Sequence, residues 1–235
     1  MVLVLYGTEG SSPVRAVLLT LRALELEHEF REIDLTAGDQ LKPDYVSKNP
    51  QHTVPTLQDG DAYICDSHAI MGYLVQKYAK DDALYPREPL QRAIVDQRLH
   101  FETGVLSIRY KQLKRLLFQE KVTELPVESL HETYALLELF LDGHEYMAGE
   151  QLTIADFSIV TSVSTAHLSF APVDATKYPN LSAWLARISM LPYYEQANLN
   201  GARRMAELVR AKLPKQFDKL WQKAFEDIKS GAGKM

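Results

Sequence analysis

The spacing of apolar positions divides the chain into two regions. In residues 1–79, short apolar runs predict strands, and stripes that recur every three or four residues predict helices. The expected order is a strand at 3–6, a helix from 14, a strand at 29–35, a hairpin of strands at 54–57 and 63–65, and a helix that begins at 66–67. This β-α-β, β-β-α order predicts a small α/β domain.

The second region is almost entirely helical in pattern. Residues 80–89, K-D-D-A-L-Y-P-R-E-P, combine charges with two prolines and are typical of a linker. Beyond them we expect an all-α domain at 90–235 with helices at 90–119, 130–141, 153–168 and 181–190. A last segment at about 215–229 predicts an amphipathic helix whose apolar face is Phe217, Leu220, Trp221, Ala224, Phe225 and Ile228. It is expected to pack on its own domain; a partner or a membrane surface is the alternative.

Two helix starts are visible in the sequence. Ser11 or Ser12 can cap the first helix, and Pro13 suits a first helical turn, where its missing N–H costs nothing. Thr153 and Asp156 have capping-box spacing, with Asp in place of the usual Glu. We therefore interpret T-I-A-D as structural and not as part of an active site.

Composition and charge narrow the function classes. The 235 residues are 46% hydrophobic and 24% charged, with a formal net charge of −5, which argues against a general attraction to nucleic acid or anionic membranes, although a local basic patch stays open. No apolar run approaches the roughly 18 residues of a membrane span. A single cysteine, Cys65, can build neither an internal disulfide nor a metal cluster, so a reducing, cytoplasmic location without a metal is expected.

One proline stands where a strand pattern begins. In N-P-Q-H-T-V-P-T-L, residues 49–57, Pro55 cannot donate a ladder hydrogen bond and pushes Val54 toward extended geometry. The backbone N–H and C=O of Val54 are then left to pair with a peptide-like ligand. The alternative interpretation is a proline that only shapes a tight turn.

Motifs along almost the whole chain carry a family resemblance. In order they are S-S-P-V-R-A (11–16), N-P-Q-H-T-V-P-T-L (49–57), D-S-H-A-I (66–70), Y-L-V-Q-K-Y (73–78), L-Y-P (84–86), V-D-Q-R-L-H-F-E-T-G (95–104), L-T-I-A-D-F-S (152–158) and L-P-Y-Y-E (191–195). Together they resemble the cytosolic glutathione transferases, and within them the insect epsilon class. The resemblance implies a thioredoxin-like N-terminal domain followed by an all-α domain.

The resemblance also implies a glutathione site on the first domain. In the family the proline that corresponds to Pro55 is cis. The residue before it, here Val54, pairs through its main chain with the cysteinyl unit of glutathione. Asp66 takes the γ-glutamyl ammonium, while Ser67 and the helix N-terminus hold the γ-glutamyl carboxylate; Asp66 and Ser67 also suit a helix cap. His52 meets the glycyl carboxylate. The full expected set is Gln40, His52, Thr53, Val54, Pro55, Asp66, Ser67 and His68.

One position in this set departs from the family pattern. Gln40 stands where many relatives have a second histidine, so its side chain can donate a hydrogen bond to a carboxylate but brings no positive charge. We expect somewhat weaker glutathione binding from that side.

The thiol partner has two candidates. The class usually shows S-P-P, and alignment through Tyr6 and Arg15 puts its serine at Ser11, with Ser12 as the fallback; Ser12 can then be the helix cap before Pro13. A hydroxyl donor is needed because the thiolate attacks. Lowering the thiol pKa from about 8.5 to about 6.5 raises the thiolate fraction about tenfold at pH 7.5, but the loss of nucleophilicity nearly cancels that gain. Most of the acceleration is therefore expected from holding the electrophile beside the sulfur.

The resemblance places the acceptor pocket on the long helix of the second domain. Its expected residues are Ser107, Tyr110, Lys111, Lys114 and Phe118. Several relatives have larger apolar residues where Ser107 and Lys114 stand, so a more polar and roomier pocket is expected; an exposed face is the alternative for the two lysines. His68 and His100 are expected at or near the family's dimer interface.

These expectations combine into one hypothesis with two rivals. The main hypothesis is a cytosolic homodimeric glutathione transferase that uses glutathione as co-substrate, adds its thiolate to small hydrophobic electrophiles and needs no metal, nucleic acid or membrane. The first rival is a non-catalytic or weakly catalytic protein that binds hydrophobic ligands, which the S-S-P departure favours. The second is a glutathione-dependent peroxidase or isomerase, because the same activated sulfur serves each reaction.

Overall fold

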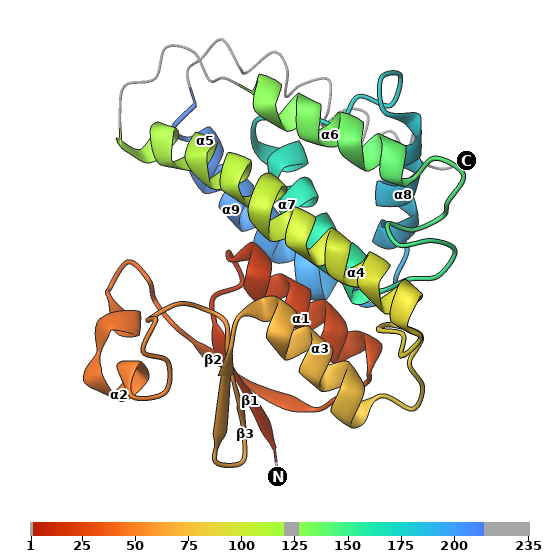
Figure 1. Cartoon of the computed structure of the whole chain (residues 1–235). Helices are drawn as coiled ribbons and strands as arrows, with labels where there is room; N and C mark the ends of the chain where they lie inside the picture. Colours follow the sequence, from red (N-terminus) through yellow and green to blue (C-terminus); the bar gives the residue numbers. More distant parts are fainter. Residues whose placement is uncertain (1, 120–126, 214–235) are drawn as a thin grey trace.

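The computed structural model of the chain describes residues 2–119 and 127–213. The helix expected at about 215–229 lies outside the described residues. Figure 1 shows a small sheet-containing domain at one end and a larger helical domain packed against it. The architecture agrees with the fold expected from the sequence, a thioredoxin-like domain followed by an all-α domain.

The first domain is a four-stranded mixed sheet with the order β2-β1-β3-β4. Strand β1 pairs parallel with β2 and antiparallel with β3, and β3 pairs antiparallel with β4. Helices α1 and α3 lie between the sheet and the helical domain, while α2 lies at the side (Figure 1). The elements are β1 (Leu3–Gly7), α1 (Ser12–Ala23), β2 (His28–Glu32), η1 (Asp39–Leu41), α2 (Pro43–Val46), β3 (Thr56–Asp59), β4 (Ala62–Cys65) and α3 (Ser67–Tyr78).

The start of α1 decides between the two serines that the sequence offered as a cap. Ser11 has extended backbone angles and occupies the N-cap position, and the helix begins at Ser12. Of the two cap candidates, Ser11 therefore occupies the N-cap position and Ser12 does not. Val14, Val17 and Leu21 are fully buried, as their spacing predicted, in a core cluster that they share with Leu5 and Leu57 of the sheet; α1 also contacts α7.

Two strand boundaries also differ. The strand expected at 54–57 begins at Thr56, because Pro55 has no N–H with which to join the ladder. The Val54–Pro55 peptide bond is cis, as the family resemblance implied. The strand expected at 29–35 ends at Glu32, and its last contact with β1 is the hydrogen bond from the Ile33 N–H to the Gly7 carbonyl, 2.8 Å.

The second domain is built around α7. Nearly every residue of α7 is buried, and it contacts α1 of the first domain as well as α4 and α9. The expected helix at 90–119 is helical throughout, but its middle is a π-helical segment, η2. The elements are α4 (Pro89–Phe101), η2 (Glu102–Leu106), α5 (Ser107–Gln119), α6 (Glu128–Phe140), α7 (Ile154–Ser169), α8 (Pro179–Ser189), η3 (Glu195–Leu199) and α9 (Asn200–Arg210).

The capping box at the start of α7 is confirmed. Thr153 is the N-cap residue, and the Asp156 carboxylate accepts hydrogen bonds from its N–H (2.8 Å) and hydroxyl (3.1 Å). The same carboxylate accepts from the Met147 N–H and from the Trp184 indole, each at 2.9 Å. Asp156 thus closes a buried network inside the helical domain.

Helix α9 was not predicted from the sequence. Asn200–Gly201 is a turn signal, and it hides the helical pattern that follows. In the structure Gly201 presses against the loop before α1, where a Cβ would lie 2.1 Å from the Glu9 carbonyl oxygen. The glycine is therefore required by a close contact between the two domains and not by a turn.

Candidate functional site

Four segments of the first domain meet at one edge of its sheet. Tyr6 near the end of β1 pairs with Thr56 at the start of β3, and Thr56 pairs with Cys65 at the end of β4. The end of β2 lies at the same edge, because β2 runs parallel to β1. The segments that leave or enter this edge are 8–12, 33–42, 52–55 and 66–68. Every first-domain residue expected to meet glutathione or its thiol lies in them.

A buried polar network holds the segment before β3. The Asn49 side-chain amide donates to the Thr53 carbonyl (2.9 Å) and to the Thr56 hydroxyl (3.0 Å). The Tyr45 hydroxyl also reaches the Thr53 carbonyl, at 2.5 Å, and the Thr56 hydroxyl, at 2.9 Å. Asn49 and Thr56 are completely buried. This network fixes the backbone on either side of Val54. Its only sign in the sequence is the asparagine at the start of the N-P-Q-H motif.

Two residues at this edge have left-handed backbone angles that are uncommon outside glycine. Asp66 has φ 72° and His52 has φ 45°. Such conformations cost free energy and occur preferentially at binding and catalytic sites. Their position agrees with a functional edge.

Asp66 caps α3 through one carboxylate oxygen. Its Oδ1 accepts from the backbone N–H groups of His68 (2.9 Å) and Ala69 (3.2 Å), so the expected cap is confirmed. Among the described residues Oδ2 has no hydrogen bond, and the side chain is exposed. Ser67 is buried in the first turn of α3. A ligand ammonium can therefore approach Asp66 without displacing the cap.

The remaining glutathione candidates differ in exposure. His52 and Thr53 are exposed, Val54 is half-buried and Pro55 is buried. Gln40 is half-buried, with Nε2 3.5 Å from the Leu35 carbonyl and Oε1 buried without a partner among the described residues.

The two candidate serines have different surroundings. The Ser12 hydroxyl is buried and accepts a hydrogen bond from the Arg15 guanidinium, 3.0 Å away. Ser11 is half-buried and makes no side-chain capping bond to its own helix. Ser12 is thus engaged inside the protein, whereas Ser11 stands at the sheet edge described above.

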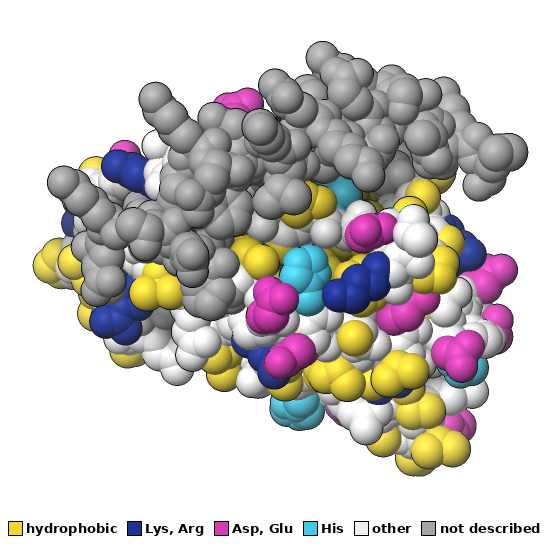
Figure 2. Space-filling view, turned by 90° about the horizontal axis from the view of Figure 1, so that it is seen from above, with side chains coloured by type: hydrophobic (Ala, Val, Ile, Leu, Met, Phe, Trp, Pro, Cys, Tyr) yellow, Lys and Arg dark blue, Asp and Glu magenta, His cyan; other side chains and the backbone are white. Residues whose placement is uncertain are grey.

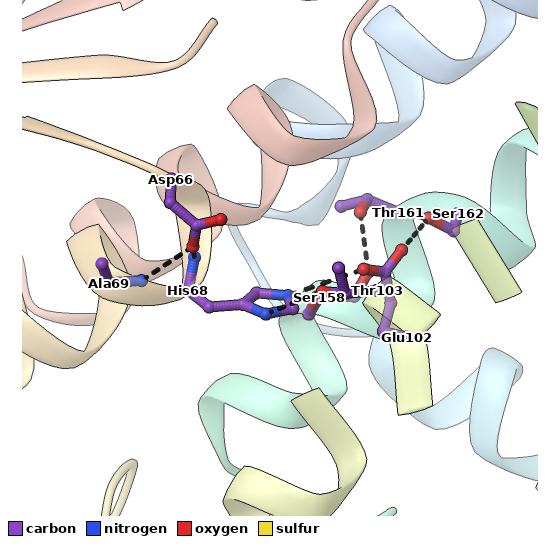
Figure 3. Close-up of polar contacts among 8 residues, drawn as sticks. All are labelled: Asp66, His68, Ala69, Glu102, Thr103, Ser158, Thr161 and Ser162. Carbon is purple, nitrogen blue, oxygen red and sulfur yellow. Dashed lines mark hydrogen bonds and ion pairs between the residues drawn. The ribbon is translucent and has the colours of Figure 1, made fainter. Parts of the chain in front are cut away.

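His68 is turned toward the second domain. Figure 3 shows its ring pointing toward Ser158 of α7 and Thr103 of η2; Nε2 lies 2.7 Å from the Ser158 hydroxyl and Nδ1 lies 3.2 Å from the Thr103 hydroxyl. The Glu102 carboxylate is 3.5 Å from Nε2 and accepts from the Ser162 hydroxyl at 2.7 Å. Within one chain His68 therefore links α3 to the helical domain, and its expected contact with glutathione stays a prediction.

The expected acceptor residues share one helix but not one environment. Ser107 and Tyr110 are buried, and the Tyr110 ring stacks on Phe170 with centroids 5.8 Å apart. Lys114 is half-buried, and burial, followed by the nearby positive charge of Arg15, lowers its pKa. Lys111 is exposed. Phe118 lies in α5, but its side chain is outside the described residues.

A hollow of about 680 Å³ lies elsewhere on the first domain. It is lined by Val2, Leu21, Arg22, Glu25, Leu26, Glu27, His28, Glu29 and Phe30. His28 begins β2, so this hollow is at the opposite edge of the sheet from the segments described above. It is therefore separate from the candidate site.

The described surface and helices give three further observations. On the face shown in Figure 2, acidic and basic side chains are interspersed with apolar ones. Among the residues placed by the structure, no group of three or more His, Cys, Asp or Glu is arranged to hold a metal ion. None of the described helices combines the length and apolar character that a bilayer crossing requires.

Comparison with known proteins identifies the family. The model "Glutathione S-transferase, N-terminal domain" matches residues 5–82, and "Glutathione S-transferase, C-terminal domain" matches residues 110–196. Glutathione S-transferase 1 of Manduca sexta is 42% identical over 217 residues, which cover 91% of this chain and 100% of the relative. The chain belongs to the glutathione S-transferase family, whose co-substrate is glutathione, and its activity is glutathione conjugation to electrophilic compounds.

Solved structures give the same result. An epsilon-class glutathione S-transferase from the housefly, Musca domestica, is similar with a TM-score of 0.86 and 51% identity, covering 89% of this chain and 98% of that one. A glutathione transferase homologue from Drosophila mojavensis, solved with bound glutathione, has a TM-score of 0.85 and 48% identity, covering 90% and 97%. The similarity to insect enzymes therefore extends over nearly the whole of both relatives.

Proposed function

We propose that this chain is an epsilon-class-like glutathione transferase that binds glutathione across the sheet edge formed by residues 8–12, 33–42, 52–55 and 66–68. The convergence of these four segments is the observation that carries the proposal. The identity of 51% to the housefly epsilon-class structure supports the class.

Glutathione binds as an added extended segment beside Val54. The network of Asn49 and Tyr45 fixes the backbone around this residue, so its N–H and C=O are preorganised for the cysteinyl unit. At the γ-glutamyl end, the N-terminus of α3 with Ser67 receives the carboxylate and Asp66 receives the ammonium. At the glycyl end, His52 and Gln40 donate to the carboxylate, and Thr53 and Pro55 complete the surroundings. His68, the neighbour of Ser67 in the first turn of α3, is the last member of the expected set.

The Ser11 hydroxyl donates a hydrogen bond to the glutathione sulfur. It stands at the sheet edge, while the neighbouring Ser12 hydroxyl is buried against Arg15. The hydrogen bond favours the thiolate, which is the attacking form. The electrophile lies between the domains, beside Ser107, Tyr110, Lys111, Lys114 and Phe118.

The assembly and location complete the proposal. The chain forms a homodimer with His68 and His100 at or near the interface, and its domains divide into 1–79, a linker at 80–89 and 90–235. A cytosolic location is predicted from the sequence. Light scattering of the purified protein tests the dimer, for which twice the chain mass of 26.7 kDa is expected.

A panel of acceptors tests the reaction. Purified protein is mixed with glutathione and a chlorodinitrobenzene, a hydroperoxide or an isomerisable β,γ-unsaturated ketone. Conjugation of the aromatic halide above the uncatalysed rate is expected. Glutathione binding without any such rate would instead favour a ligand-binding protein, and turnover confined to the other two acceptors would favour a peroxidase or isomerase.

Substitution of Asp66 tests the binding mode. Asp66→Ala is expected to raise the KM for glutathione about tenfold or more, because it removes the partner of the ammonium. Asp66→Asn is the matched control, because an amide oxygen still caps α3 but carries no charge. A KM raised in both variants supports an ammonium contact; a KM raised in Asp66→Ala alone would reduce Asp66 to a cap, and no change in either would remove it from the site.

A further inference from the structure

Arg15 is a buried cation held entirely by neutral oxygens. Its side chain is completely buried where α1 meets α7 and η3. One terminal nitrogen donates to the backbone and side-chain oxygens of Asn198. The other donates to the Ser12 hydroxyl (3.0 Å), the Thr161 carbonyl (3.2 Å) and the Thr165 hydroxyl (2.5 Å). Among the described residues, Nε has no partner.

No carboxylate neutralises this charge in the described part of the chain. Arg15 takes part in none of the ion pairs among the described residues. The titratable groups that face the Arg15 guanidinium are Tyr110, Tyr194 and the cationic Lys114. Burial lowers the pKa of Arg15 to about 10, so the guanidinium is still protonated at neutral pH. Burying a charge without an opposite charge nearby costs free energy of folding. A buried, uncompensated guanidinium at this position therefore suggests a role other than stability.

The charge lies directly behind the candidate thiol site. The Arg15 backbone N–H donates to the Ser11 carbonyl (3.1 Å), and its side chain reaches back to the Ser12 hydroxyl. The N-terminus of α1, which begins at Ser12, adds a partial positive charge at the same place. An anion that contacts Ser11 therefore lies in the field of both, and because the guanidinium is excluded from water, that field is weakly screened.

We propose that the buried charge of Arg15 stabilises the glutathione thiolate at Ser11, and that Asn198 is a positioning residue which holds this charge without neutralising it. The proposal rests on the proposed function, because it requires glutathione at the sheet edge. It assigns a role in thiol ionisation to η3 of the second domain, 183 residues from Arg15 in the sequence.

Isosteric neutralisation tests the proposal. Asn198→Asp places a carboxylate on the guanidinium with almost no change in shape, and Thr165→Asp does so from α7; Thr165→Val is the matched control that removes a hydrogen bond without adding charge. The thiol pKa of bound glutathione is measured from thiolate absorbance against pH. Each Asp variant is expected to raise that pKa by about one unit, a tenfold change in the acid constant, and Thr165→Val to move it by less than about 0.3.

Turnover supplies a second readout. At pH 7.5 it should change less than about threefold in the Asp variants, because a more basic thiolate is a better nucleophile, while the acid limb of the pH–rate profile moves by about one unit. Thermal unfolding identifies any variant that does not fold, and either Asp variant is sufficient for the test.

The outcomes are separable. Wild-type protein that does not bind glutathione would overturn the proposed function itself. Folded Asp variants that bind glutathione with an unchanged thiol pKa would overturn the role of Arg15 alone, and so would a Thr165→Val shift equal to that of Thr165→Asp, because it would trace the effect to packing and not to charge.

Discussion

Two completely buried charged residues, Arg15 and Asp156, differ in where their hydrogen-bond partners come from. Asp156 accepts four hydrogen bonds from donors that all belong to the helical domain. Arg15 begins on the first domain and takes most of its acceptors from the second. The Asp156 network closes on itself and needs no ligand, whereas the Arg15 network ends beside Ser12 at the candidate site. A buried charge that is fully satisfied within its own domain indicates a structural role. The network of Arg15, which spans both domains and ends at the candidate site, is consistent with the functional role proposed for it.

Asp156→Ala should have the largest effect on stability. It leaves the Met147 and Thr153 N–H groups and the Trp184 indole without their acceptor, so we expect the free energy of unfolding to fall by about 3–5 kcal/mol. Denaturant unfolding measures this loss, and Asp142→Ala, at an exposed position of the same domain, should cost less than about 0.5 kcal/mol. A loss below about 1 kcal/mol would contradict the structural role.

Asp59 extends the comparison to a carboxylate that has a cationic partner. Its Oδ2 accepts from Lys77 and Tyr73 (both 2.6 Å) and from Tyr78 (2.5 Å), and these hydrogen bonds, led by that of Lys77, lower the pKa of Asp59 to about 2. The folded-state pKa is below the ordinary value of 3.8, so the stabilisation is present above that pH and is lost as the pH falls toward 2. Asp59→Asn should therefore lower the free energy of unfolding by about 1–2 kcal/mol at pH 6.

Urea unfolding between pH 6 and pH 3 measures this pH dependence. The gap between wild type and Asp59→Asn should narrow below about pH 4, because the ordinary pKa of an aspartate is near that value. A gap of constant size down to pH 3 would show that the charge of Asp59 does not contribute. Lys77→Met is the companion variant, because it removes the cation and keeps both tyrosine hydroxyls. In this variant the free energy of unfolding should depend less on pH than in wild type, but the dependence should not disappear.

Ser12→Ala should have the smallest effect. It removes one of five acceptors of Arg15, so a loss of about 1 kcal/mol in the free energy of unfolding is expected, with turnover nearly unchanged. Steady-state kinetics with a chlorodinitrobenzene measure the turnover. A fall of tenfold or more would mean that Ser12, and not Ser11, serves the thiol.

Local patterns in the sequence predicted most of the fold. The strands, α1, α3 and the capping box of α7 follow from apolar spacing and short motifs, and the cis Pro55 follows from the family resemblance. Helix α9 could not be predicted, because Gly201 near its start reads as a turn residue. The reason for this glycine is a close contact with the Glu9 carbonyl, which exists only in the folded protein.

The candidate site shows the same limit. Ser11, His52 and Asp66 were named from their motifs, but their supports were not. Asn49 and Tyr45 lie close in sequence to the segment that they hold, yet nothing in their spacing shows that both reach Thr53. The acceptors of Arg15 lie up to 183 residues away, and long-range pairs of this kind leave no periodic signal. The sequence also does not reveal the Arg15–Ser12 hydrogen bond, which gives Ser12 surroundings different from those of Ser11.

The central claim is that glutathione lies at the common sheet edge with its sulfur at Ser11. The most direct test is the thiolate absorbance of bound glutathione against pH, in wild type, Ser11→Ala and Ser12→Ala. We expect a thiol pKa below the ordinary value of about 8.5 in wild type, a rise of at least one unit in Ser11→Ala and a shift of less than half a unit in Ser12→Ala. A rise in Ser12→Ala with none in Ser11→Ala, or a failure of wild-type protein to retain glutathione at millimolar concentration, would contradict the account.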